Sequence, residues 1–340
     1  MDPEIQFGKK SVSLKQGKGE VVLSGTLQGR IFCILEGILL HKFDAALAAK
    51  PSPDSFNNIG GNSFWPAPEG GDFAFNYDAA GKWYVQDDIN RKECEVTTDG
   101  REMTGVKHVV LRNRRGAEVA MMIRRTVKGI DCPNGVQGVE SIGYESLDEM
   151  IFDRPLPVEE VLLNGWSLEQ LPGGDGVLSF CAMDGDPAAA INADFYVDPG
   201  DTIACYPDHF EFDISSRDRI QIGIRKDARP RLTGALDTRR GILAIRHTPI
   251  RSRGMYVNIA DNAQEKGPFS TADVYSIFNG GDMGFYELET IAPLDVNCEG
   301  LGMGSRLESR SCFYHGAVPA LLQVLSLNYG IELQNKMVKK

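Results

Sequence analysis

The stretch Arg219-Ile-Gln-Ile-Gly-Ile-Arg225 shows the pattern that decides the fold. Isoleucine alternates here with arginine, glutamine and glycine, so in an extended chain the apolar side chains all point to one side. A period of two is typical of an antiparallel strand with one apolar and one polar face. The segment therefore predicts a half-buried antiparallel strand.

Short runs of this kind recur along the whole chain of 340 residues, for example at 19–24, 107–112, 120–127 and 241–246. Many short strands separated by Gly and Pro turns predict an all-β protein, here a large antiparallel β-sandwich with a few short helices. Helical patterns are confined to 43–49, 158–163 and 319–329. Because no shift in composition marks a boundary, we expect a single domain over residues 1–340.

The charge balance and the cysteines restrict the partners and the compartment. With 36 basic and 47 acidic residues the formal net charge is −11, which argues against nucleic acid as a partner. The apolar stretch 31–40 is far shorter than the ~20 residues that a membrane helix needs, so no membrane association is expected. The seven cysteines form no Cys-x-x-Cys pair, and the chain starts without a leader pattern. We therefore expect a cytoplasmic protein with reduced thiols, unless a secretion signal was trimmed from the chain.

No motif for a cofactor or a metal is present in the sequence. The glycine-rich spots at 173–176 and 300–304 lack the strand-loop-helix order of a phosphate loop. The sequence also lacks His-Glu-x-x-His and Gly-x-Ser-x-Gly. We therefore expect chemistry that uses neither a cofactor nor a metal ion.

Residues 56–75 form the most informative loop, because they combine aromatic rings, amides, carboxylates and glycines in one segment. Sugar sites use this mixture: an aromatic ring covers the apolar face of a pyranose, while polar side chains bind its hydroxyls. Asn62, Trp65 and Glu69 are the candidate ligand-binding residues in this loop. The alternative is a turn-rich loop that anchors Trp65 in the core.

A second candidate site lies at residues 274–293. On a strand, Glu287 and Glu289 would share one face, with their side chains about 7 Å apart. If a cleft buries the two carboxyls, one of them can have a raised pKa and act as a general base. If they face solvent, they are ordinary surface charges.

Four blocks, taken together, resemble the aldose 1-epimerase (galactose mutarotase)-like superfamily, and more closely its uncharacterised bacterial branch of sugar-epimerase-like proteins. They lie at 27–32, 59–71, 219–223 and 277–294, and begin with Leu-Gln-Gly-Arg, Ile-Gly-Gly-Asn, Arg-Ile-Gln-Ile and Ile-Phe-Asn-Gly. The resemblance implies a twisted β-supersandwich with a carbohydrate-binding face.

The resemblance also implies roles for individual residues. Glu289, in Glu-Thr followed by Pro293, is similar to the catalytic base of mutarotases, although the Gln and Asp of that motif are absent here. The two mutarotase histidines have no match, so Glu287 or His315 would be the general acid. Trp65, Glu69, Asn62 and Arg219 would bind the sugar.

Several functions remain open on this fold. The first is an epimerase-like isomerase that interconverts sugar anomers by general acid/base catalysis. The others are a non-catalytic sugar-binding or sensing protein, a polysaccharide lyase-like enzyme and a structural β-domain. The net charge of −11 disfavours a polyanionic substrate, so the expected partner is a neutral mono- or oligosaccharide. The sequence does not indicate the oligomeric state.

Overall fold

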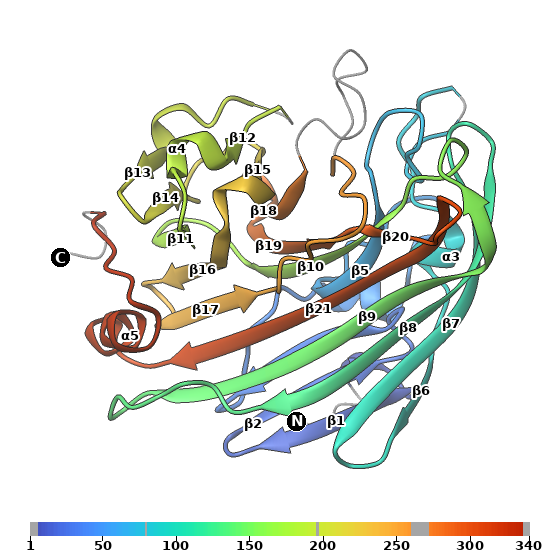
Figure 1. The fold of residues 1–340 in the computed structure, drawn as a ribbon. Helices are drawn as coiled ribbons and strands as arrows, with labels where there is room; N and C mark the ends of the chain where they lie inside the picture. Colours follow the sequence, from blue (N-terminus) through green and yellow to red (C-terminus); the bar gives the residue numbers. More distant parts are fainter. Residues whose placement is uncertain (1–5, 79, 195–196, 260–271, 336–340) are drawn as a thin grey trace.

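Two large antiparallel sheets pack face to face in the computed structural model, which describes residues 6–78, 80–194, 197–259 and 272–335 (Figure 1). The first sheet has ten strands, in spatial order β1 (Ser11–Gln16), β2 (Gly19–Ser24), β3 (Arg30–Leu35), β5 (Gly61–Ala67), β10 (Asn164–Pro172), β19 (Phe285–Ala292), β18 (Asp273–Asn279), β15 (Ile220–Arg225) and β12 (Ile191–Asn192), with β4 (Ile38–Leu39) paired to β3.

The second sheet has eleven strands, in spatial order β13 (Ile203–Cys205), β14 (His209–Asp213), β11 (Val177–Met183), β16 (Pro230–Asp237), β17 (Ile242–His247), β21 (Leu301–His315), β9 (Glu140–Pro157), β8 (Glu118–Ile130), β7 (Glu102–Arg112) and β6 (Glu95–Thr98), with β20 (Leu294–Val296) paired to β21. The predicted all-β sandwich is therefore confirmed.

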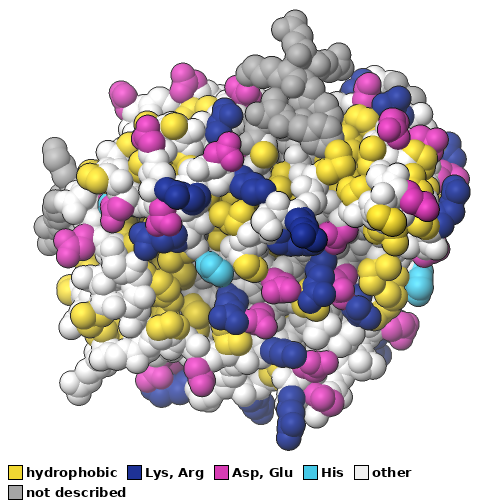
Figure 2. All heavy atoms as spheres, viewed as in Figure 1, with side chains coloured by type: hydrophobic (Ala, Val, Ile, Leu, Met, Phe, Trp, Pro, Cys, Tyr) yellow, Lys and Arg dark blue, Asp and Glu magenta, His cyan; other side chains and the backbone are white. Residues whose placement is uncertain are grey.

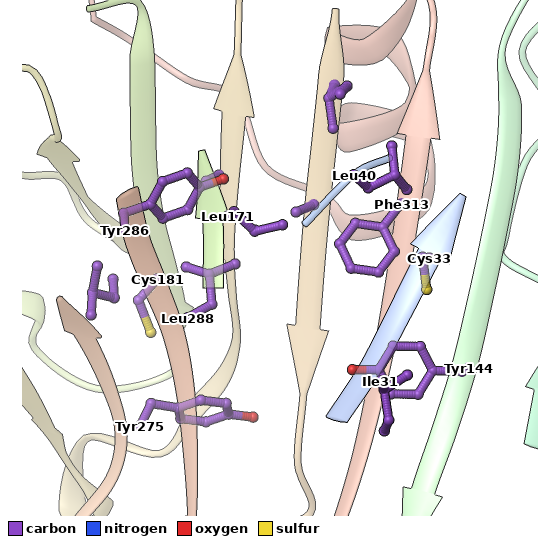
Figure 3. Packing of buried hydrophobic residues seen from close by; sticks show 14 of the residues in the cluster. Ile31, Cys33, Leu40, Tyr144, Leu171, Cys181, Tyr275, Tyr286, Leu288 and Phe313 are labelled. Carbon is purple, nitrogen blue, oxygen red and sulfur yellow. The ribbon is translucent and has the colours of Figure 1, made fainter. Parts of the chain in front are cut away.

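The main core lies between the two sheets and is built by the alternation seen in the sequence. In β15 the isoleucines at 220, 222 and 224 all point into it. Tyr144, Tyr275 and Leu288, from three different strands, also belong to this cluster and are fully buried (Figure 3). Each such apolar side chain stabilises the fold by roughly 1.5–3 kcal/mol, so this layer holds the sheets together.

The prediction of a half-buried strand at 219–225 is wrong in one respect. The strand is antiparallel, as expected, but Gln221 on its polar face is only 4% exposed. The reason is that loops cover this outer face of the ten-stranded sheet. The covered face forms the floor of the cavity described below.

The helices are few and short, as predicted. They are α2 (Ala45–Ala49), α3 (Asp87–Asn90), α4 (Pro187–Ala190) and α5 (Val318–Val324), with a π-helical turn at Leu325–Tyr329 and 3₁₀ turns at Gly200–Thr202, Lys226–Ala228 and Gly281–Met283. The helix expected at 158–163 is wrong: a turn over 158–160 leads into chain without regular secondary structure, whose apolar side chains at 161–163 are all buried. No helix in the described ranges is long and apolar enough to span a membrane.

Charged side chains on the long strands pair across the sheet. Arg310 of β21 contacts Glu145 of β9 at 2.6 Å, and Arg124 of β8 contacts Glu149 of β9 at 2.7 Å. On the face shown in Figure 2, basic and acidic side chains are accordingly interspersed. An exposed pair such as Arg310–Glu145 contributes little to stability, so the sandwich depends on its apolar core.

Candidate functional site

A cavity of about 500 Å³ opens on the outer face of the ten-stranded sheet, opposite the main core. This volume suits a small-molecule ligand. The residues that line it come from the sheet and from the loops above: Phe56, Asn58, Ser63, Trp65, Glu69, Tyr77, Trp83, Trp166, Leu168, Gln170, Arg219, Gln221, Phe278, Met283, Phe285 and Glu287. All three tryptophans of the chain belong to this lining.

The register of the strands assembles the floor of the cavity. Gln170 of β10 is the cross-strand partner of Glu287 in β19, which in turn pairs with Phe278 of β18 and, through it, with Gln221 of β15. Because side chains two residues apart share a face, Glu289 lies in the next row on the same side. Residues distant in sequence thus form one floor, in which polar side chains flank the ring of Phe278.

The two carboxyls on this floor occupy different environments. Glu289 is fully buried and accepts hydrogen bonds from Trp166 Nε1 at 2.9 Å and from Gln221 Nε2 at 3.2 Å. Glu287 is 6% exposed, faces the cavity and accepts from Gln170 Nε2 at 2.5 Å.

Burial raises the pKa of both groups because it penalises the charged form. The pKa of Glu287 rises to about 7, and the pKa of Glu289 rises well above its usual value, through burial and then the negative charge of Glu287. The pair can therefore gain or lose a proton near neutral pH.

One wall of the cavity comes from β5 and from the chain segments before and after it. Glu69 accepts a hydrogen bond from Trp83 Nε1 at 2.7 Å, and burial raises its pKa. Phe56 packs edge-on against Trp65 and Trp83, at centroid distances of 5.2 and 5.7 Å. The cavity thus has one wall of linked aromatic rings and, besides Glu287, a second titratable carboxyl.

Arg219 lies at the edge of the cavity, where its guanidinium stacks over the ring of Phe278 at 5.6 Å. Its positive charge partly offsets the burial effect on the pKa of Glu69. Trp65, Glu69, Arg219 and Glu287, four of the residues singled out in the sequence, therefore line one cavity. Glu289 lies on the same face but does not line the cavity.

Asn62 does not reach this cavity, which differs from the sequence-based expectation. It alternates with Ser63 and Trp65 along β5 and therefore points to the opposite face, between the sheets. Its side-chain Nδ2 donates to Ser167 Oγ and to Glu169 Oε2, both at 3.1 Å. Its Oδ1 accepts from Arg125 at 2.5 Å.

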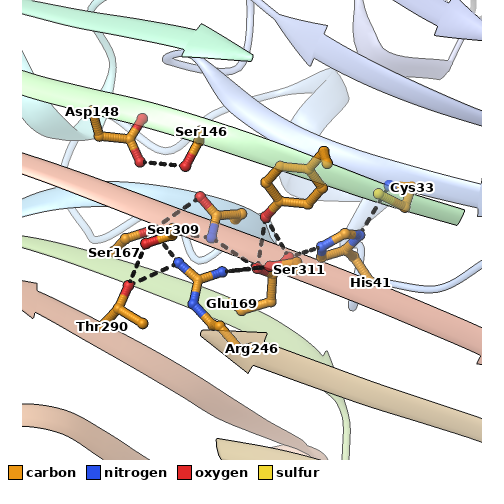
Figure 4. Close-up of polar contacts among 12 residues, drawn as sticks. Cys33, His41, Ser146, Asp148, Ser167, Glu169, Arg246, Thr290, Ser309 and Ser311 are labelled. Atoms are coloured by element: carbon orange, nitrogen blue, oxygen red, sulfur yellow. Dashed lines mark hydrogen bonds and ion pairs between the residues drawn. The ribbon is translucent and has the colours of Figure 1, made fainter. Parts of the chain in front are cut away.

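Glu169 is the centre of this buried network between the sheets (Figure 4). Tyr144 donates to it at 2.6 Å, Arg246 forms an ion pair with it, and His41 Nε2 lies 2.5 Å away. The Cys33 N–H donates to His41 Nδ1 at 3.0 Å, and burial lowers the pKa of this histidine to about 3. His41 is therefore neutral and donates through Nε2, and the network ties the two sheets together.

His315, the other candidate acid, also lies away from the cavity. It ends β21 in the second sheet, and its Nδ1 contacts Glu36 Oε2 at 2.8 Å. The structure therefore does not bring His315 together with Glu287 and Glu289. Within the described ranges, no group of three or more His, Cys, Asp or Glu side chains is placed to hold a metal ion.

Three important lining residues were not identified from the sequence: Trp83, Trp166 and Gln170. Trp166, Leu168 and Gln170 alternate along β10, and this spacing is the signal that could have placed them on one face. Their pairing with β5 and β19 spans more than a hundred residues of sequence, as in the contact of Trp166 with Glu289.

Comparison of the sequence with known proteins gives one family match. The model of a family described as "Family of unknown function (DUF6786)" matches residues 5–335. A comparison with curated proteins finds no match.

Two solved structures share the fold. The Slr1438 protein from Synechocystis sp. superposes with a TM-score of 0.51 at 11% identity, covering 90% of this chain and 96% of that chain. A galactose mutarotase-like protein from Lactobacillus casei superposes with a TM-score of 0.50 at 7% identity, covering 90% of this chain and all of its own (100%). These likenesses confirm the predicted galactose mutarotase-like fold.

Proposed function

The chain belongs to the family of unknown function (DUF6786), so we propose its function from the cavity itself: it binds a sugar and interconverts the anomers of that sugar by acid/base catalysis. The observation that carries the proposal is the convergence of three tryptophans and two titratable carboxyls, Glu287 and Glu69, in one cavity. The fold of the mutarotase-like structure supports a carbohydrate-related role.

Binding follows from the chemistry of the walls. Trp65 and Trp166 line the cavity, and an indole ring offers apolar surface to the C–H face of a pyranose. Polar atoms of Ser63, Gln170 and Arg219 lie around the same space and can bind hydroxyl groups. This combination suits a mono- or oligosaccharide better than a purely apolar ligand.

In the proposed reaction Glu287 is the base. Its ionised carboxylate takes the proton of the anomeric hydroxyl, the C1 carbonyl forms, and the bond from C1 to the ring oxygen breaks. Glu69, whose pKa is raised, gives its proton to the ring oxygen. After rotation about the C1–C2 bond, attack on the other carbonyl face reverses both transfers and restores the two carboxyl groups.

This assignment changes the role given to Glu289. Its carboxyl already accepts from Trp166 and Gln221 and lies beneath the lining, so it does not meet the substrate directly. Because Glu289 is fully buried and Glu287 faces the cavity, we place the proton that the pair shares on Glu289. Glu289 is therefore proposed as the residue that keeps Glu287 ionised and poised near neutral pH.

A non-catalytic sugar-binding protein is the second candidate. The observation that favours it is that the described lining residues include no histidine, the side chain that most often serves as general acid or base. Calorimetric binding without any gain in the rate of anomer exchange would select this alternative.

Anomer exchange, followed by polarimetry or NMR on fresh solutions of single anomers, tests the catalytic proposal. We expect the rate above the uncatalysed background to fall at least about 100-fold in Glu287→Gln, the usual share of general acid/base catalysis. Glu299→Gln, at an exposed position, is the matched control and should retain the full rate. Full activity in Glu287→Gln would refute the role of this residue.

A further inference from the structure

Four of the N–H donors around the cavity are already engaged with carboxyl groups. Four indole and amide donors each hold a carboxyl: Trp166 and Gln221 donate to Glu289, Gln170 donates to Glu287, and Trp83 donates to Glu69. A ligand that enters the cavity therefore meets these four donors already paired with carboxyls.

Two buried acceptors, in contrast, have no partner among the described residues. Gln170 Oε1 and Asn58 Oδ1 are buried, belong to residues that line the cavity, and have no hydrogen-bond partner in the described part of the chain. Gln170 is only 4% exposed, and its orientation is fixed because its Nε2 donates to Glu287. A buried acceptor without a partner costs roughly 1–3 kcal/mol, so both oxygens favour a ligand that donates.

The charged side chains around the cavity also favour a ligand that donates hydrogen bonds. Glu69 and Glu287 both line it, and among basic side chains only Arg219 belongs to the lining, at the edge over a phenyl ring. Arg30 and Lys42 also lie near Glu287, but they donate to backbone carbonyls and do not line the cavity. The cavity therefore presents a ligand with more hydrogen-bond acceptors and carboxyl groups than positively charged groups.

An ammonium group matches this arrangement better than a hydroxyl group. It has three donors and no acceptor, whereas a hydroxyl group also needs a donor from the protein. Aromatic ring faces, such as those of Trp65 and Trp166, attract a cation as well as a sugar ring.

We propose that the ligand of this cavity is an amino sugar whose protonated amine donates to Gln170 Oε1 and to the carboxylate of Glu287. The inference rests on the proposed sugar-binding function and replaces the expectation of a neutral sugar. That expectation came from the net charge of the whole chain, which is compatible with a neutral or a cationic ligand alike.

Tryptophan fluorescence is the direct test, because every tryptophan of the chain lines the cavity. The titrants are D-glucosamine, N-acetyl-D-glucosamine and D-glucose, the three galacto counterparts, and methylammonium chloride as the amine without a sugar. We expect one amino sugar to bind at least about tenfold more tightly than its N-acetylated and hydroxyl counterparts, the effect of one charge-assisted hydrogen bond.

Gln170→Met tests the acceptor, with Gln323→Met on an exposed face of α5 as the matched control. We expect the amine preference to fall below about threefold in Gln170→Met and to persist in the control. A thermal unfolding curve for each variant establishes that it is folded. The titrations of the wild type test the amine preference even if a variant does not fold.

The outcomes separate this inference from the proposed function. If neutral sugars bind as tightly as amino sugars, or methylammonium binds as tightly as either, the amino-sugar inference is overturned. If no sugar of the panel binds, the sugar-binding proposal fails as well. If the amine preference survives in Gln170→Met, the assignment of Gln170 is wrong.

Discussion

Replacing Glu287 by glutamine is expected to stabilise the protein above neutral pH. Burial raises the pKa of this carboxyl from 4.5 to about 7, so between these values the folded chain holds a proton that the unfolded chain has released. Stability is therefore highest below the unfolded pKa and falls as pH rises through the folded pKa. The glutamine carbonyl can still accept the hydrogen bond from Gln170 Nε2.

The magnitude follows from the two pKa values. Since one pH unit is worth about 1.4 kcal/mol per proton, the ionised Glu287 costs the fold at most about 3 kcal/mol at pH 8 and about 1 kcal/mol at pH 5. Glu287→Gln removes this cost. The difference in the free energy of unfolding between the variant and the wild type should therefore be about 2 kcal/mol larger at pH 8 than at pH 5, in favour of the variant.

Urea unfolding of the wild type, Glu287→Gln and the exposed control Glu299→Gln at the two pH values measures this difference. The control should have the same free energy of unfolding as the wild type at both pH values. If Glu287→Gln shifts stability by the same amount at pH 5 and pH 8, or destabilises the fold more at pH 8, the reasoning about the buried carboxyl is refuted.

Three further changes test the contacts beneath and behind the cavity. Trp166→Phe removes the indole donor 2.9 Å from Glu289 and should cost about 1–3 kcal/mol in urea unfolding; an unchanged midpoint would contradict the assigned hydrogen bond. Arg246→Met leaves the Glu169 carboxylate buried without its guanidinium, so thermal unfolding should reveal a loss of about 3–5 kcal/mol, partly recovered by adding Glu169→Gln. Because burial lowers the pKa of His41 to about 3, the stability that neutral His41 provides is fully present above its unfolded pKa and is lost as pH falls below 6.5. His41→Gln should therefore flatten the decline of stability between pH 6.5 and pH 4, and an equal slope in both proteins would argue against a neutral, buried histidine.

Local pattern was enough to predict the strands but not the pairing of distant ones. The alternation in Arg219 to Arg225 predicted β15, and the composition of the loop around Trp65 and Glu69 indicated a ligand site. Trp166 and Gln170 were missed because their role depends on the register of β10 with β5 and β19. Long-range register is fixed by the packing of the whole sheet and leaves no local signal.

Asn62 illustrates a second limit of sequence reasoning. It is adjacent to Ser63, and the two side chains point to opposite faces of β5, one toward Glu169 and one toward the cavity. Because both faces of this strand are buried and both carry polar groups, polarity alone does not show which face holds the site. His315 was misplaced for the related reason that its partner, Glu36, is 279 residues away.

The central claim, that this cavity is a sugar site, is tested most directly by calorimetric titration of the wild type and Ser63→Phe with the monosaccharides and amino sugars named above. Ser63 lines the cavity and is 6% exposed, so a phenyl ring at this position would occupy the space meant for the ligand. The account predicts saturable binding of at least one sugar to the wild type and no binding to folded Ser63→Phe. Absence of binding to the wild type, or equal binding to Ser63→Phe, would contradict it.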